Sequence, residues 1–185
     1  MKKKQNSLSD ADTALLALLC EGPMHPWQLE KNVKDRDMRF WTGLSQSTIY
    51  KQLRALERVG HIACSEEIQS GRLRKVYTVT RKGREALKKN LRLFLSEPEH
   101  LKYRIDLGTY NVDLLPPKQA LDALTSYRQK LEEQIKGYGE LEKFLDSCGC
   151  PAHRKAVARR PIHLFKGEIE WVDEYLAYLK GAARA

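Results

Sequence analysis

The chain has 185 residues, of which 42% are hydrophobic and 31% charged, and its formal net charge is +9. This length is enough for one large domain or two small ones, each with a buried core. No apolar run approaches the ~20 residues of a membrane-spanning helix, and a polar stretch follows the basic start of the chain, which argues against a secretory signal, so we expect a cytoplasmic protein with no membrane partner.

The first predicted helix begins at Ser9, a residue type that caps helix N-termini, and two aspartates suit the dipole of its first turn. Residues 14–20 are apolar on nearly all sides, which predicts a buried helix. Gly22-Pro23 ends it. Pro26 then suits the first turn of a second helix, which continues to Val33.

A loop around residues 40–43 leads to a third predicted helix over 45–60, with Ser45 or Ser47 as its cap and Gly60 just past its end. Apolar residues recur along it at spacings of four and three, which predicts one buried face. That face comprises Ile49, Leu53 and Leu56. The opposite face carries side chains of the kinds that meet base edges and phosphates, namely Gln46, Ser47, Lys51, Gln52, Arg54 and Arg58.

Two strands follow, over 61–68 and 73–79, with Gly71 in the turn between them. The two-residue period of a strand places Leu73, Tyr77 and Val79 on one face. Thr80 is then expected to cap a fourth helix that runs to about Ser96. Its inward residues are predicted to be Ala86, Leu87, Leu91 and either Phe94 or Leu95.

A two-faced helix followed by a basic hairpin is what a winged helix-turn-helix needs for DNA binding. The charge distribution agrees, because residues 1–95 contain the whole positive excess and residues 96–185 are balanced. A phosphate backbone favours such a basic half through counterion release. The residues predicted to contact DNA are Gln46, Ser47, Thr48, Tyr50, Lys51, Gln52, Arg54, Arg72, Arg74 and Lys75.

Alternatives stay open for these residues. Ser45 or Ser47 could serve only as a helix cap, and Tyr50 could pack in the core beside Ile49. Any one wing cation could simply be solvated, as surface charges usually are.

The second half is predicted to be helical, with a fifth helix near Ile105, a long helix from Pro116-Pro117 to about Cys148, and a last helix after the break at residues 148–151. Its apolar stripes are broad, and a partner chain would cover them economically. The alternative is a core shared with the N-terminal part. The predicted dimerisation residues are Leu124, Leu131, Tyr138, Leu145, Ile162, Phe165, Ile169, Val172, Leu176 and Leu179.

Trp27, Trp41 and Trp171 could line a pocket for a flat effector, although such residues more often belong to a core. Cys148 and Cys150 form a C-x-C at the helix break. A thiol switch is one interpretation, since neighbouring basic residues favour thiolates, and incidental cysteines are the other. We expect no metal site, because the nearby histidines do not follow a zinc spacing.

Several segments together resemble the PadR family of bacterial transcriptional regulators. They are residues 14–19, 21–25, 40–41, 47–50, 53–60 and 74–84, and the resemblance covers roughly residues 8–95. The second half, with Trp171 on the last helix, is similar to the longer helical C-terminal domain of the virulence-activator branch. The chain departs from the family in Pro26-Trp27, where Gly-Tyr is usual, and in Lys51, where proline often follows the tyrosine.

The resemblance implies a homodimer that binds an inverted repeat, usually as a repressor, and that responds to a small hydrophobic or aromatic effector. We expect no enzyme activity and no cofactor, since the chain lacks a phosphate-binding glycine loop and the G-x-S-x-G and H-E-x-x-H motifs. A winged helix used for protein binding and a thiol-responsive regulator are the alternatives.

The predicted fold class is mainly α with a small β-hairpin. Residues 1–96 are expected to form a winged helix-turn-helix, and residues 97–185 a helical domain for dimerisation and effector sensing.

Overall fold

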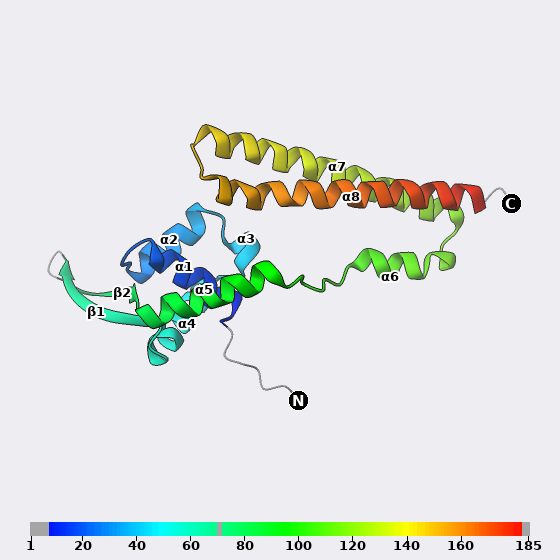
Figure 1. The fold of residues 1–185 in the computed structure, drawn as a ribbon. Helices are drawn as coiled ribbons and strands as arrows, with labels where there is room; N and C mark the ends of the chain where they lie inside the picture. The colour runs from blue at the N-terminus through cyan, green and yellow to red at the C-terminus, as the bar shows by residue number, and fades with distance from the viewer. Residues whose placement is uncertain (1–7, 70–71, 183–185) are drawn as a thin grey trace, which may run out of the picture. The chain divides into compact units, whose positions relative to one another are not determined.

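In the computed structural model, the chain divides into two compact units, Met1–His100 and Leu101–Ala185 (Figure 1). The structure describes residues 8–69 and 72–182, without the side chains of Phe40, Gln69, Arg72 and Ala182. The basic residues at the start of the chain and the predicted turn at Gly71 lie outside the described residues. The predicted domain boundary at 96/97 coincides with the end of helix α5.

The predicted fold class is confirmed, since the described residues form helices and one antiparallel hairpin. The N-terminal unit consists of α1 (Asp10–Cys20), α2 (Pro26–Asp35), α3 (Arg39–Thr42), α4 (Gln46–Arg58), β1 (Ile62–Gln69), β2 (Arg72–Val79) and α5 (Arg81–Ser96). The C-terminal unit consists of α6 (Arg104–Tyr110), the 3-10 turn η1 (Val112–Leu114), α7 (Pro117–Ser147) and α8 (Ala152–Ala182). No helix among the described residues is both long and apolar enough to cross a bilayer.

Helix α1 lies at the centre of the N-terminal unit and begins where the sequence predicts. Ser9 Oγ accepts a hydrogen bond from the Asp12 backbone N–H, and the Asp12 carboxylate accepts one from the Ser9 N–H, which together form a capping box. Four leucines of the helix are almost completely buried. The core that they form with α2, α4 and the hairpin holds the unit together.

The segment predicted as a loop around residues 40–43 contains the short helix α3, so the sequence prediction was wrong here. Buried Met38 and Leu44 flank α3 and anchor it at both ends. The Thr42 hydroxyl donates a hydrogen bond to the Met38 carbonyl oxygen at 2.6 Å, and Gly43 ends the turn with φ at +63°. One helical turn is too short to show a hydrophobic period, which explains the error.

Strands β1 and β2 pair in one register from Ile62↔Val79 to Gln69↔Arg72. Tyr77 and Val79 are buried as predicted, but Leu73 is exposed although its position in the strand puts it on the same face. The hairpin therefore extends beyond the core at its turn end. Met24, in the loop before α2, adds a short bridge to Tyr77.

Helix α5 begins as predicted, because the Thr80 hydroxyl oxygen accepts a hydrogen bond from the Gly83 N–H. Leu87 is buried, and Asn90 donates a hydrogen bond to the Thr13 hydroxyl of α1. Beyond Asn90 the prediction was wrong, because the predicted inward residues Leu91, Phe94 and Leu95 are exposed in the single chain. The helix continues past the core, so nothing in its own unit covers that turn.

Helices α7 and α8 pack side by side in the C-terminal unit (Figure 1). Four of the ten predicted dimerisation residues, Leu124, Leu131, Val172 and Leu176, are buried between helices of the same chain. Those four therefore stabilise the single chain and offer no area to a partner. The other six are half-buried, namely Tyr138, Leu145, Ile162, Phe165, Ile169 and Leu179.

Gly83 allows α5 to pack closely against the start of the hairpin. A Cβ atom at this position would lie 2.0 Å from the His61 carbonyl oxygen, which is backbone and cannot swing away. We expect Gly83→Ala to lower the free energy of unfolding by about 3 kcal/mol, measured by urea unfolding with circular dichroism. Glu85→Ala, an exposed position on the same helix, is the control and should change it by less than about 0.5 kcal/mol. Equal midpoints for the two variants would contradict the close packing.

Candidate nucleic-acid interface

Helix α4 separates its residues cleanly into two faces. Ile49, Leu53 and Leu56 are at most 3% exposed and belong to the core of the N-terminal unit. The predicted DNA-contacting residues of α4 lie on the other side. Gln46, Ser47, Tyr50, Lys51 and Arg54 are exposed, and Thr48 and Gln52 are half-buried. Tyr50 is 43% exposed, so it is not a core residue beside Ile49.

Ser45, and not Ser47, is the N-cap of α4. The Ser45 hydroxyl oxygen accepts a hydrogen bond from the Thr48 backbone N–H at 3.2 Å. It also lies 2.7 Å from the Thr48 hydroxyl and 3.1 Å from the Ser47 hydroxyl. The cap fixes the first turn of α4, which leaves the side chains of Gln46 and Ser47 at the exposed end of the helix.

His25 joins the start of α2 to the hairpin, a role that sequence reasoning missed. The His25 ring is buried, and its Nδ1–H donates to the Lys75 carbonyl oxygen at 2.9 Å, because a carbonyl oxygen can only accept. The Met24 N–H and carbonyl oxygen both pair with the Tyr77 backbone, at 3.0 and 2.9 Å. The loop before α2 therefore joins the hairpin through a single-residue β-bridge at Met24, and Pro26 begins α2 shortly after it.

Each wing cation whose side chain is described stands opposite a glutamate. The register pairs Lys75 with Glu66, and Arg74 with Glu67. Lys75 is exposed and Arg74 is half-buried. Arg72, the third predicted wing residue, pairs with Gln69 at the backbone, and its side chain lies outside those described. The cross-strand glutamates offset the positive charge of the wing, a feature visible only once the register is known.

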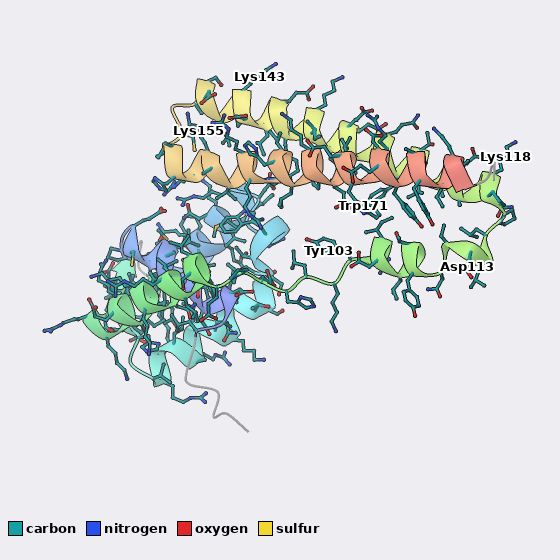
Figure 2. The ribbon with its side chains drawn as sticks, turned by 45° about the vertical axis from the view of Figure 1, so that its right-hand side comes forward. Tyr103, Asp113, Lys118, Lys143, Lys155 and Trp171 are labelled. Atoms are coloured by element: carbon teal, nitrogen blue, oxygen red, sulfur yellow. The ribbon has the colours of Figure 1, made fainter. Side chains whose placement is uncertain are left out.

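The three tryptophans are divided between the two units. Trp27 and Trp41 are 49% and 60% exposed on the N-terminal unit. Trp171 lies on α8 of the other unit (Figure 2). Its ring stacks on Tyr175 at a centroid distance of 5.6 Å.

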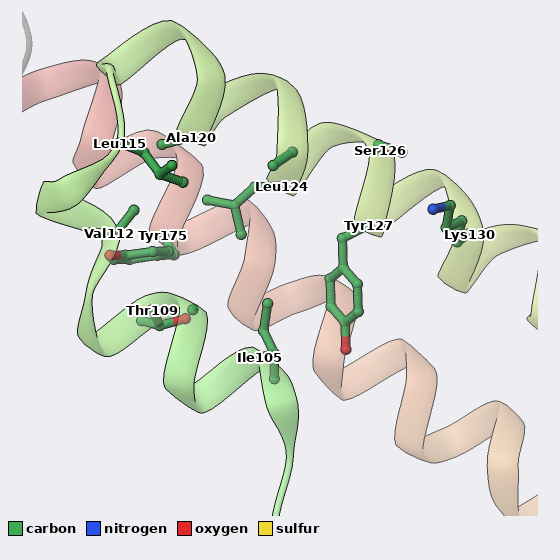
Figure 3. Close-up of a pocket in the computed structure, with 12 residues that line it drawn as sticks. Ile105, Thr109, Val112, Leu115, Ala120, Leu124, Ser126, Tyr127, Lys130 and Tyr175 are labelled. Atoms are coloured by element: carbon green, nitrogen blue, oxygen red, sulfur yellow. The ribbon is translucent and has the colours of Figure 1, made fainter.

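The C-terminal unit contains a cavity of about 470 Å³ that no tryptophan lines (Figure 3). Its walls come from α6, η1, α7 and α8, and they are mainly apolar. Residues that line it include Ile105, Thr109, Leu124, Tyr127, Lys130 and Tyr175. No pattern in the sequence predicts this cavity, because its walls come from four separate elements.

Two polar groups mark the cavity wall. The Tyr127 hydroxyl donates a hydrogen bond to Glu168 Oε1 at 3.1 Å, and burial together with the Glu168 charge raises the pKa of Tyr127 to about 12. The phenol therefore stays protonated at physiological pH. The Thr109 hydroxyl oxygen is buried and has no hydrogen-bond partner among the described residues, so it is available to a bound molecule.

The C-x-C segment forms the end of α7. The Cys150 N–H donates to the Leu145 carbonyl oxygen and the Gly149 N–H to that of Asp146, with Gly149 at φ +66°, as in a Schellman motif. Lys155, one of the basic residues expected to favour a thiolate, instead pairs with the Asp146 carboxylate. Within the described part of the chain, no group of three or more His, Cys, Asp and Glu side chains is placed to hold a metal ion.

Both halves of the chain match families of known proteins. Residues 15–89 match the transcriptional regulator PadR-like family, and residues 109–180 match the virulence activator alpha C-terminal family. The negative transcriptional regulator PadR of Bacillus subtilis is 25% identical over 174 residues, which are 90% of this chain and 95% of that protein.

Solved structures share the fold. Bacillus subtilis PadR in complex with operator DNA has a TM-score of 0.71 at 22% identity, over 91% of this chain and 98% of that one. The same protein with p-coumaric acid has a TM-score of 0.73 at 21% identity, over 92% and 96%. The Vibrio cholerae virulence activator AphA has a TM-score of 0.65 at 17% identity, over 93% and 99%.

The two serines at the start of α4 provide a matched pair of variants. Ser45→Ala removes the cap and should lower the free energy of unfolding by about 1 kcal/mol. Ser47→Ala removes an exposed hydroxyl that accepts no hydrogen bond from a backbone N–H of the described residues, and it should change the free energy of unfolding by less than about 0.5 kcal/mol. Thermal unfolding with circular dichroism measures both. A larger loss for Ser47→Ala would reverse the assignment.

Proposed function

Because this chain belongs to the PadR-like family of transcriptional regulators, we propose that it binds duplex DNA in a sequence-specific manner through α4 and the β1–β2 wing. The observation that carries the proposal is the two-faced α4. Its apolar face is buried in the core of the N-terminal unit, so its polar and cationic face remains exposed and can bind another molecule. The solved complex of Bacillus subtilis PadR with operator DNA supports the same use of the fold.

In this proposal, α4 enters the major groove with its N-terminal end toward the bases. Gln46, Ser47 and Gln52 have side chains that can read base edges, whereas Lys51 and Arg54 suit phosphates. Tyr50 suits a phosphate through its hydroxyl. Arg72, Arg74 and Lys75 on the wing then reach the neighbouring backbone or the minor groove.

We further propose that two copies bind an inverted repeat as a homodimer. Apolar side chains remain exposed in each unit, and a second copy would bury them in a symmetric interface. They are Leu91, Phe94 and Leu95 on α5, and Leu107, Tyr110 and Leu114 around α6 and η1. The half-buried members of the predicted dimerisation set lie beside the contact between α7 and α8, and they would form the edge of the dimer interface. Repression is the expected outcome, since the Bacillus subtilis relative is a negative regulator.

The cavity of the C-terminal unit is the proposed effector site. Its volume and apolar walls suit a small aromatic molecule, and the Thr109 hydroxyl and Lys130 supply polar partners. The complex of Bacillus subtilis PadR with p-coumaric acid supports a ligand of this class. In this proposal, binding of the effector lowers the affinity for DNA.

Selection of bound sequences from a random duplex pool, at two salt concentrations, tests DNA recognition. We expect an enriched inverted repeat whose affinity falls steeply with salt. Lys51→Gln should weaken binding to all duplexes and lower the salt slope by about one, whereas Lys143→Gln, an exposed lysine on α7, should change neither. Without enrichment or salt-dependent retention, a winged helix that binds proteins would be the better interpretation.

Filling the cavity tests the effector site. Ala123 lines the cavity from an exposed position on α7, so Ala123→Phe should fill it without damage to the core. We expect p-coumaric acid to bind this variant at least about tenfold more weakly by calorimetry, since a change of 1.4 kcal/mol corresponds to tenfold, while affinity for the operator is retained. Ala177→Phe, an exposed position on α8 outside the lining, is the control. Equal p-coumaric acid binding by both variants would place the effector elsewhere.

A further inference from the structure

One face of the hairpin carries an apolar pair that the core does not cover. Alternate cross-strand pairs share a face, so Ile68↔Leu73 near the turn lies on the same face as Ile62↔Val79 at the base of the hairpin. The pairs Cys64↔Tyr77 and Glu66↔Lys75 lie between them on that face. Ile62 and Val79, the residue pair at the base of the hairpin, are at most 6% exposed. Ile68 and Leu73 are 79% and 64% exposed, although they have the same apolar character.

The hairpin is joined to the DNA-reading half of the unit. Its base packs in the same core as Ile49 of α4, and its middle is tied to the loop before α2 through Tyr77 and Lys75. The tip pair continues the face that packs on this core. Because the hairpin shares this core with α4, the tip pair is held in one rigid unit with the proposed α4 interface.

The charges of the wing are mixed in sign. The register places Lys75 opposite Glu66 and Arg74 opposite Glu67, so a carboxylate faces each of these two cations across the hairpin and lowers the net positive charge there. An apolar contact would add to the phosphate contacts proposed for the wing cations. The exposed pair of Ile68 and Leu73 can supply such a contact.

We propose that Ile68 and Leu73 enter the minor groove beside the site of α4 and pack against its sugar walls. This inference rests on the proposed DNA binding. The Cβ atoms of a cross-strand pair lie about 5 Å apart, so the pair with its side chains is broader than the minor groove of B-DNA, which is about 6 Å wide. The pair would therefore widen the groove as it packs on the two walls. Apolar side chains of this kind act as wedges that partly open base steps in other minor-groove binders.

The contact has a thermodynamic signature that separates it from the cationic contacts. Burial of apolar area releases no counterions, so it raises affinity without changing the salt slope. It also favours base steps that deform easily, such as TA or CA, at the position that the wing reaches. The apolar pair therefore contributes specificity at the flank of the operator.

The test compares Ile68→Thr, Leu73→Thr and the double variant with Ala63→Thr, at an exposed position near the base of β1. Threonine keeps the strand preference and removes apolar area, so all four variants should unfold like the wild-type chain. The operator is the repeat selected by the wild-type protein. Affinity for it is measured at several salt concentrations, with a Lys75→Gln variant for comparison.

We expect the double variant to bind the operator about tenfold more weakly with an unchanged salt slope, and to lose preference at the flanking step. Ala63→Thr should bind like wild type. If the double variant binds the operator within twofold of the wild-type affinity, the inference is overturned. It is also overturned if the double variant loses the mass of a dimer in solution and keeps its affinity for DNA. Failure of the wild-type chain to select any sequence would instead refute the proposed function, so the two failures are distinguishable.

Discussion

Burial of one face of α4 is the constraint on which the proposed interface depends. Ile49, Leu53 and Leu56 can enter the core in only one rotation of the helix, because apolar residues must leave water together. That rotation alone puts Lys51 and Arg54 outside. A different rotation would bury a charged side chain without a partner, which is far more costly than any gain in packing. The chemistry of the exposed face is therefore set by the interior.

Features encoded over a few neighbouring residues could be predicted from the sequence. The caps at Ser9 and Thr80 and the apolar period of α4 depend on contacts within one or two turns, and the structure confirms them. The α3 turn lacks a period of its own. The exposure of Leu91 and Phe94 depends on where the core ends, which is a property of the assembled unit.

The candidate site likewise contains features that could be predicted from the sequence and features that depend on the assembled structure. The polar face of α4 is the complement of its apolar period, so it could be read from the sequence. The acids opposite the wing cations depend on strand register, and the cavity depends on four elements that meet in space. The last two helices carry the broad apolar stripes that the sequence predicts, but much of each stripe faces the other helix of the same chain. Two 31-residue helices joined by a tight turn can bury their apolar side chains against one another before a partner chain is needed.

The bridge between Met24 and Tyr77 and the bond from His25 to Lys75 have a consequence for binding kinetics. They join the loop before α2 to the wing through a backbone bridge and the His25 ring, and the hairpin shares its core with α4. In the proposed complex with DNA, α4 and the hairpin would therefore act as two arms of a bivalent ligand with almost no linker. Once one arm is seated, the other is presented at a high effective concentration. Dissociation then requires both arms to leave together, which lengthens residence on a correct site, while a site that fits only one arm is released quickly.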